Sequence, residues 1–237
     1  MMGTQRKGTM RVAEIYKSIQ GEGFLTGTES TFVRAAGCNL RCWFCDTPFA
    51  SWNPEGEDLA VEEILSLIAP LACRHVVVSG GEPMLFAELI PLCQRLHEAG
   101  CQITIETAGT LYLPLECDLM SISPKLSNSI PPEQLAPKWH TRHERSRHAP
   151  DAIRRLVAEH PYQFKFVVGQ RADGQEVLQY LERFPEIDRS RVMLMPLGTE
   201  VEHLRRIADW LVGYCEDQGL LFCPRKQIEW FGLTRGT

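Results

Sequence analysis

The 237-residue sequence contains no apolar run that approaches the ~18 residues of a membrane-spanning helix. Its first ten residues, MMGTQRKGTM, have no hydrophobic core of the kind that a secretory signal carries. We therefore expect a cytoplasmic protein with no membrane partner. Thiols stay reduced in that compartment, so the nine cysteines are not expected to form disulfides.

Positive charge is also scarce. The chain has 25 Lys and Arg against 30 Asp and Glu, a formal net charge of −5, and no long basic stripe. This balance argues against nucleic acid as a direct partner. One exception is the His-rich, locally basic segment KWHTRHERSRH, residues 138–148, which fits either a solvated loop or a contact for an anion or a partner.

Internal repeats and low-complexity tracts are absent, and segments with strand and helix patterns alternate instead. Strands are expected over residues 11–20, 31–37, 75–81, 101–107, 117–124, 162–169, 191–198 and 220–225, and helices over 59–71, 84–100, 151–160, 174–184 and 200–219. This alternation predicts a single α/β domain over residues 1–237, an incomplete TIM-type barrel of about six parallel strands. The proline-containing stretch 124–148 has few apolar residues and is not expected to hold a regular helix.

A fourth cysteine is missing from the segment GCNLRCWFCDT, where Cys38, Cys42 and Cys45 have the spacing C-x3-C-x2-C. Thiolates select iron–sulfur clusters, zinc or copper. A four-iron cluster normally takes four cysteines, so three would leave one iron open to bind a ligand through an amine and a carboxylate. Trp43 and Phe44 would shield such a cluster from water.

Two other interpretations of the three cysteines stay open. A structural zinc ion needs four ligands, and the next candidates, Cys73 and His75, are almost 30 residues away. A redox role for the Cys42–Cys45 pair leaves Cys38 unexplained. The six cysteines elsewhere are interpreted as small buried side chains.

Short motifs follow several predicted strands, where parallel barrels carry their chemistry. They are QGEG (20–23), SGGEP (79–83), ETAGT (106–110) and SISPK (121–125). Glycines in SGGEP permit close approach of a ligand, and Glu82 could accept hydrogen bonds from an amine. Lys125 could hold an adenosine or a carboxylate. Each motif alone also fits a tight turn or a surface lysine.

The cysteine motif followed by GGEP after the next strand–helix unit resembles the radical S-adenosylmethionine (SAM) superfamily. The resemblance implies one 4Fe-4S cluster per subunit, whose open iron binds the methionine amine and carboxylate of SAM. An electron from the cluster would then break a carbon–sulfur bond and release a 5′-deoxyadenosyl radical. The cofactor supplies this chemistry, and the protein orients it.

The complete set of motifs, from about residue 12 to the tail IEWFGLTRGT, resembles the 7-carboxy-7-deazaguanine synthase family. The resemblance implies a Mg²⁺-dependent carbon–nitrogen lyase of queuosine and 7-deazapurine biosynthesis. It would convert 6-carboxy-5,6,7,8-tetrahydropterin into 7-carboxy-7-deazaguanine with release of ammonia. It also implies a homodimer, an electron donor such as flavodoxin and a tail (224–237) that closes the active site. Residues 1–10 are separately expected to be disordered.

The same resemblance assigns roles to residues. Cys38, Cys42 and Cys45 would bind the cluster, and Thr47 would bind Mg²⁺ through its hydroxyl. Arg34 would pair with the substrate carboxylate. The other expected substrate contacts are Ile19, Gln20, Gly21, Glu22, Ser79 and Thr237, and the expected SAM contacts are Gly81, Glu82, Ser123, Pro124 and Lys125.

The sequence departs from the family pattern at two places. Residues 195–198 read MPLG, where relatives often have Gln-Pro and a polar residue, and Gln227 stands where a histidine is common. No role is assigned to either. An activase that forms a glycyl radical on a partner protein and a zinc-bearing scaffold are the alternative functions.

Overall fold

The computed structural model describes residues 8–237. Residues 1–10 were expected to be disordered, and residues 1–7 of this range lie outside the described part of the chain. The expectation is contradicted at residues 9 and 10: Thr9 is 4% exposed, and Met10 is fully buried and begins the first strand.

A nine-stranded sheet in the order β3-β1-β2-β4-β5-β6-β7-β8-β9 forms the framework. The strands are β1 (Met10–Ile19), β2 (Glu29–Ala35), β3 (Glu57–Leu59), β4 (His75–Gly80), β5 (Gln102–Thr107), β6 (Leu119–Ile122), β7 (Tyr162–Val168), β8 (Val192–Pro196) and β9 (Leu221–Phe222). All neighbours from β2 to β9 are parallel, whereas β1 is antiparallel to both β2 and β3. The predicted partial barrel is confirmed, with β3 and β9 as its two unjoined edges.

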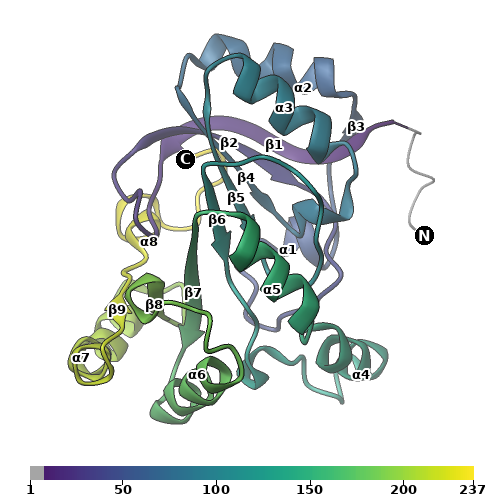
Figure 1. The fold of residues 1–237 in the computed structure, drawn as a ribbon. Coiled ribbons are helices and arrows are strands. Elements are labelled where there is room, and N and C mark those ends of the chain that lie inside the picture. The colour runs from purple at the N-terminus through teal and green to yellow at the C-terminus, as the bar shows by residue number, and fades with distance from the viewer. Residues whose placement is uncertain (1–7) are drawn as a thin grey trace.

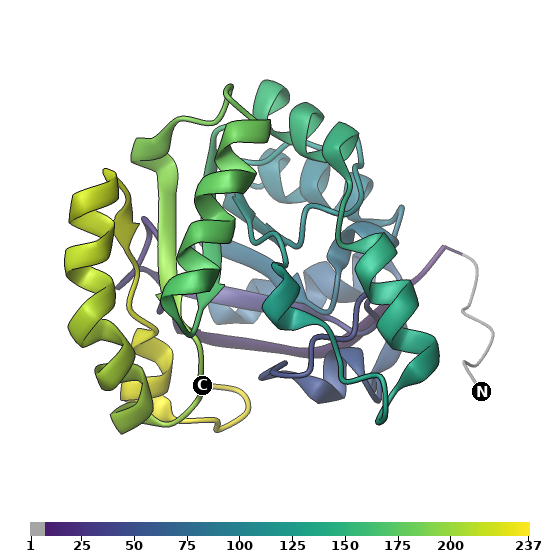
Figure 2. The same ribbon diagram turned by 90° about the horizontal axis from the view of Figure 1, so that it is seen from below.

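The longer helices lie around the outside of the curved sheet, whereas the short helices α1 (Pro48–Ser51) and α8 (Lys226–Phe231) lie at the ends of the strands (Figure 1, and from below in Figure 2). The longer helices are α2 (Val61–Ile68), α3 (Leu89–Glu98), α4 (Pro137–Ser146), α5 (Pro150–Glu159), α6 (Arg171–Arg183) and α7 (Val201–Gln218). The connection from β5 to β6, residues 108–118, contains neither helix nor strand. Within residues 8–237, no helix has both the length and the apolar character that crossing a bilayer demands.

Helix α4 corrects the expectation that residues 124–148 hold no regular helix. Pro137 lies in its first turn, where the missing amide hydrogen costs nothing. Its inner side is formed by Trp139 and by His143, which is fully buried. Because this inner side is aromatic and polar rather than aliphatic, the hydrophobic pattern could not reveal the helix.

The central strands are buried on both faces, and the two faces differ in chemistry. In β7, Phe164 and Phe166 belong to the main hydrophobic core, whereas Gln163 and Lys165 alternate with them and are also buried. Strand β5, separated from β7 by β6, repeats the pattern with apolar Ile105 and buried polar Thr104. The inside of the barrel is therefore polar, and its outside is apolar beneath the helices.

The cysteines outside the cluster motif are all free. Cys93, Cys215 and Cys223 are buried, as expected, but Cys73, Cys101 and Cys117 are partly exposed. Cys223 packs with Met193 and Met195 on the inner side of β8.

Candidate active site

A cavity of about 300 Å³ opens at the carboxyl ends of the parallel strands. Fourteen of the sixteen residues singled out in the sequence line it, although they come from six separate segments: Ile19, Gln20, Gly21, Glu22, Arg34, Cys38, Cys42, Cys45, Thr47, Ser79, Gly81, Ser123, Lys125 and Thr237. The tail also contributes to the wall from Arg225 onward. The fold therefore joins motifs that the sequence presents separately.

Glu82 and Pro124 are the two singled-out residues that do not line the cavity, and both are buried. The Glu82 carboxylate accepts hydrogen bonds from Met84 N (3.1 Å), Thr107 Oγ1 (2.9 Å) and Ala108 N (2.9 Å). Glu82 therefore ties the end of β4 to the end of β5. The contact between its carboxylate and the amine of SAM, expected from the sequence, stays a prediction.

Cys38, Cys42 and Cys45 face the cavity from the loop after β2. Burial raises the pKa of the Cys38 and Cys42 thiols to about 12, although positively charged Arg41 and Lys125 lie close enough to oppose the shift. Thiolates are the metal-binding form, and a bound metal centre stabilises them directly. The buried thiols are therefore suited to binding a cationic metal centre, which would stabilise their thiolate forms.

The arrangement fits a multi-iron cluster better than a single zinc ion. Across residues 8–237, no three His, Cys, Asp or Glu side chains are grouped closely enough to hold one metal ion. His75, a possible zinc ligand with Cys73, is instead enclosed between Ser30 Oγ (2.7 Å) and Thr104 Oγ1 (2.8 Å). Cys73 lies beside Glu29 at the amino ends of the parallel strands, away from the cavity.

Backbone-directed hydrogen bonds fix the loop that carries the cysteines. Trp52 Nε1 donates to Cys42 O (2.9 Å), and Arg41 Nη1 donates to Cys38 O (2.7 Å). Phe44 lines the cavity, as a shield for a cluster would. Trp43 does not: its side chain is directed outward, is 54% exposed and donates from Nε1 to Asn128 O (2.7 Å).

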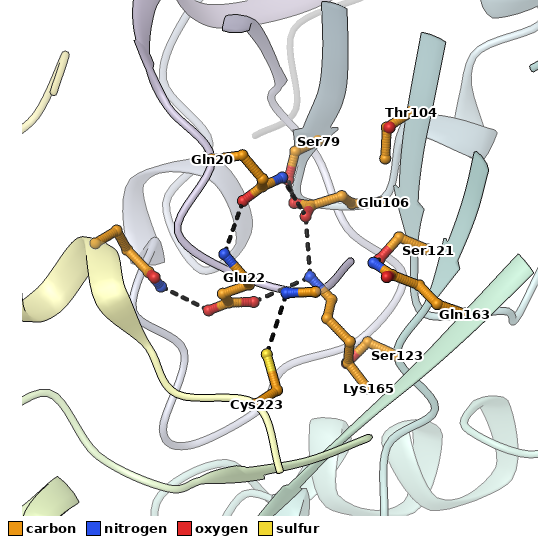
Figure 3. A network of polar contacts seen from close by, with 12 residues as sticks. Gln20, Glu22, Ser79, Thr104, Glu106, Ser121, Ser123, Gln163, Lys165 and Cys223 are labelled. Carbon is orange, nitrogen blue, oxygen red and sulfur yellow. Dashed lines mark hydrogen bonds and ion pairs between the residues drawn. The ribbon is translucent and has the colours of Figure 1, made fainter. Parts of the chain in front are cut away.

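A buried ionic network occupies the opposite side of the cavity (Figure 3). Lys165 Nζ donates to Glu22 Oε2 (3.0 Å) and to Glu106 Oε1 (2.9 Å), and the lysine is 3% exposed. Ser79 Oγ donates to Glu106 Oε2 (2.6 Å), and Gln20 Nε2 lies 3.4 Å from Glu106 Oε1. Lys165 thus connects the β1–β2 loop with β5 across the inside of the barrel.

The charges of this network stabilise one another. Burial alone would raise the pKa of Glu22, but Lys165 and Arg225 outweigh it and lower that pKa to about 2. Burial alone would lower the pKa of Lys165, but Glu106 and Glu22 raise it above its usual range. Glu22 and Lys165 are therefore both ionised at neutral pH.

Arg225 joins the tail to three parts of the cavity wall. Its Nε donates to Glu22 Oε1 (3.3 Å), its Nη1 donates to Gly198 O (2.7 Å), and its Nη2 pairs with Asp46. Asp46 lies between Cys45 and Thr47 in the sequence. Arg225 therefore couples the tail to the β1–β2 loop, to the end of β8 and to the loop that carries the cysteines.

The glycine in QGEG serves this docking of the tail. A Cβ atom on Gly21 would lie 2.4 Å from Gln227 Oε1 and 2.5 Å from Gln227 N, closer than real Cβ contacts. Gln227, to which the sequence assigned no role, donates from Nε2 to Glu22 Oε1 (2.5 Å). The tail can therefore approach the β1–β2 loop only because position 21 has no side chain.

Arg34 is held against the cavity wall by two neighbours on β1. Its Nε donates to Glu14 Oε1 (2.7 Å) and its Nη2 donates to Tyr16 Oη (2.6 Å). Burial raises the pKa of Tyr16, which opposes the effect of the nearby guanidinium. The plane of the guanidinium is thus fixed before any ligand arrives.

Sequence reasoning missed Lys165, Arg225 and Asp46 and did not assign a role to Glu106. One signal for Lys165 was available: it interrupts the apolar run YQFKFVV. A charged residue in a central parallel strand is buried on either face and needs a partner. Nothing in the sequence indicated which carboxylates these would be.

The three-cysteine loop at the carboxyl end of a partial barrel defines a radical SAM enzyme, and the Radical SAM superfamily model matches residues 32–211. Membership of this superfamily implies a 4Fe-4S cluster and SAM.

Comparison with known proteins identifies the family within this superfamily. The chain is 42% identical to 7-carboxy-7-deazaguanine synthase of Rhodopirellula baltica, covering 98% of this chain and 90% of the relative. It is 35% identical to the enzyme of the same name from Halobacterium salinarum, covering 92% and 88%. QueE from Escherichia coli has a similar fold, with a TM-score of 0.68 and 21% identity over 92% of this chain and 94% of that one. This chain belongs to the 7-carboxy-7-deazaguanine synthase family, as its motifs had indicated.

Proposed function

We propose that this protein converts 6-carboxy-5,6,7,8-tetrahydropterin into 7-carboxy-7-deazaguanine and ammonia, with Mg²⁺ as an accessory ion. Family membership makes it a radical SAM carbon–nitrogen lyase of queuosine and 7-deazaguanine biosynthesis. The observation that carries the proposal is the convergence on one cavity of fourteen residues that the sequence had singled out.

Cys38, Cys42 and Cys45 would hold the cluster, and the ends of β4 and β6 would hold SAM. When bound, these groups supply a 5′-deoxyadenosyl radical for hydrogen abstraction from the substrate. Gly81 permits close approach of the backbone, because a Cβ there would lie 2.0 Å from Gly37 O. Lys125 Nζ is oriented by Ser123 O (2.7 Å) and Ser123 Oγ (2.8 Å), so its charge is fixed at the cavity wall.

The opposite wall supplies groups that match a carboxylated pterin. Arg34 presents a planar cation, oriented by Glu14 and Tyr16, which suits a carboxylate. Glu22 is ionised and offers acceptors for the N–H groups of a pterin ring. Ile19, Gln20, Gly21, Ser79 and Thr237 would complete the substrate contacts.

Thr47 is the proposed protein ligand of Mg²⁺. It lines the cavity, whereas its neighbour Asp46 is paired with Arg225. A single hard oxygen ligand, with waters and the substrate carboxylate, suits this ion because Mg²⁺ gives up its waters reluctantly.

The test is an anaerobic assay with reconstituted enzyme, SAM, reductant and carboxy-tetrahydropterin, run with and without Mg²⁺. We expect the ultraviolet spectrum of the deazapurine to appear with one equivalent of ammonia, and Mg²⁺ to accelerate it. SAM cleavage without deazapurine would contradict the proposal and favour the activase. Zinc near one per chain with little iron would instead indicate the zinc-bearing scaffold.

A further inference from the structure

Helix α4 has an exposed basic face that the proposed reaction does not use. Lys138, Arg142 and Arg145 follow the spacing i, i+4, i+7, which places them on one side of the helix, and all three are exposed. In the described part of the chain, Lys138 and Arg145 have no hydrogen-bond or ion-pair partner, and Arg142 lies over the ring of Trp139 (4.7 Å). Residues 133–148 hold four Lys or Arg and two Glu, in a chain whose net charge is −5.

The other face of α4 is fixed to the loop that carries the cysteines. Arg41 lies over the ring of Trp139 at 4.0 Å, and the backbone N–H of Arg41 donates to His143 Nδ1 (3.0 Å). Arg41 directly precedes Cys42. The basic face therefore has a fixed position beside the expected cluster.

Trp43 belongs to the loop that carries the cysteines and contacts the segment that precedes α4. It directly follows Cys42, is 54% exposed, and is held to the segment before α4 by bonds to Asn128 O and Ser129 O. The ring of Phe44, 5.5 Å from that of Trp43, reaches the cavity. Two neighbouring aromatic rings in the cysteine loop thus connect the protein surface with the cavity.

We propose that Trp43 and the basic face of α4 dock a small acidic protein that carries single electrons. This inference rests on the proposed function, because the cluster must be reduced before SAM can be cleaved. The donor loses one electron and the cluster gains one, and no bond is made or broken. Because the chain is acidic overall, an acidic donor is repelled elsewhere and steered to this face.

The same argument favours a protein over a nucleic acid. Three exposed cations on one short helix provide few phosphate contacts, and the remainder of the chain is acidic. The exposed indole supplies the apolar contact that protein interfaces prefer at their centre.

Binding can be measured without turnover, with oxidised flavodoxin as the probe and reconstituted holoprotein at low and at moderate salt. The test variant is Lys138→Glu/Arg145→Glu, which removes no hydrogen bond and no ion pair within residues 8–237. The control with the same change of charge is Arg205→Glu/Arg206→Glu on α7, which packs against β8 and β9 on the opposite side of the molecule from α4 (Figure 1). This control removes one exposed ion pair, that of Arg205 with Glu202. We expect the test variant to raise the Kd about tenfold at low salt and the control to change it less than about twofold.

The rate of cluster reduction is the second measurement. It is monitored as the loss of the visible absorbance of the oxidised cluster and is normalised to the cluster content of each variant. The test variant should be reduced about tenfold more slowly by reduced flavodoxin, but at the wild-type rate by dithionite, because only the protein donor needs the docking face. The neutral variant Lys138→Gln/Arg145→Gln should lie between the two.

Three outcomes would overturn the inference. One is unchanged flavodoxin binding and reduction in both variants. A second is an equal loss with flavodoxin and with dithionite, which would locate the defect in the cluster itself. Charge-dependent binding of a tRNA probe, without any flavodoxin binding, would likewise reject an electron donor and assign the face to nucleic acid. Because deazapurine formation with dithionite is measured separately, failure here leaves the proposed reaction standing.

Discussion

The two sides of the cavity treat buried charge in opposite ways. On the side of the β1–β2 loop and the tail, Lys165 pairs with Glu22 and Glu106, and Arg225 pairs with Glu22 and Asp46. On the side of the cluster loop, burial raises the pKa of Cys38 and Cys42 to about 12 despite nearby cations.

The wall formed by the β1–β2 loop and the tail is thus held together by its own ion pairs, whereas the wall formed by the cysteine loop depends on the group that it binds. Buried ions that are paired and hydrogen-bonded hold their geometry before a ligand arrives. Buried thiols become ligands only when a positive centre stabilises their thiolates. The substrate side is thus preorganised by the chain, and the cysteine side is organised by its cofactor.

Loss of a cysteine should have the largest effect on activity. We expect Cys42→Ala to retain at most a small fraction of the iron and sulfide of the wild type and to show no detectable turnover, because two thiolates cannot hold the cluster in place. Metal and sulfide analysis together with the deazapurine assay measures this. Full iron content with normal turnover would remove Cys42 from the site.

Lys165→Met should have the largest effect on stability. It leaves the Glu106 carboxylate without its cation and the Glu22 carboxylate with Arg225 alone, so we expect the free energy of unfolding to fall by about 3–5 kcal/mol. The control Lys17→Met removes an exposed pair with Glu29 and should cost under about 1 kcal/mol. Urea denaturation compares them. Equal decreases in the free energy of unfolding would show that the buried network stabilises the fold no more than an exposed ion pair does.

Arg34→Lys tests the substrate side without removing a charge. Lysine cannot offer a planar pair of donors, so we expect KM for the pterin to rise about tenfold, or about 1.4 kcal/mol, at unchanged iron content. Steady-state kinetics with a parallel iron assay measures both quantities. An unchanged KM would count against Arg34 as the partner of the substrate carboxylate.

His143 tests the neutral contact that attaches α4 to the cluster loop. Burial first, then Arg147 and Lys125, lower its pKa to about 4. Its Nδ1 accepts from Arg41 N, so a proton there would set two donors against each other. The neutral His143 contact contributes fully to the free energy of unfolding above the unfolded pKa of ~6.5. As pH falls towards the folded pKa of about 4, the unfolded state binds a proton that the folded state does not, and this contribution is lost.

We therefore expect the wild type to lose about 1–2 kcal/mol more unfolding free energy than His143→Gln between pH 7 and pH 5. Glutamine can accept from Arg41 N and donate to Ser129 Oγ without titrating in this range. Urea denaturation at the two pH values provides the comparison. Parallel pH dependence of the two proteins would show that His143 is not the titrating contact.

Thr47→Ala should have the smallest effect, because waters and substrate supply most ligands of Mg²⁺. We expect the stimulation by Mg²⁺ to weaken about two- to fivefold while activity without the ion is retained. A variant that responds to Mg²⁺ as strongly as the wild type would exclude Thr47 as a ligand.

The sequence could predict those parts of the site whose residues are close neighbours in the chain. Cys38, Cys42 and Cys45 lie on one loop, and Gly80 and Gly81 lie at the end of the strand that begins with His75, so their spacing in the sequence was sufficient. Trp43 was misjudged because its direction depends on a bond to Asn128. The three donors that hold the Glu82 carboxylate could not be predicted, because two of them come from the next strand of the sheet and its loop.

The sequence by itself determined the parallel α/β barrel, the three-thiol site and the positions of the strand-end motifs, because periodicity and spacing are local properties. Only the tertiary structure decided the ionic network, in which Lys165 meets Glu22 across 143 positions and Arg225 meets Asp46 across 179. It also decided the docking of the tail on Gly21 and of α4 beside the cysteines. The physical reason is that a buried charge requires a partner, but which partner it finds depends on which strands become neighbours.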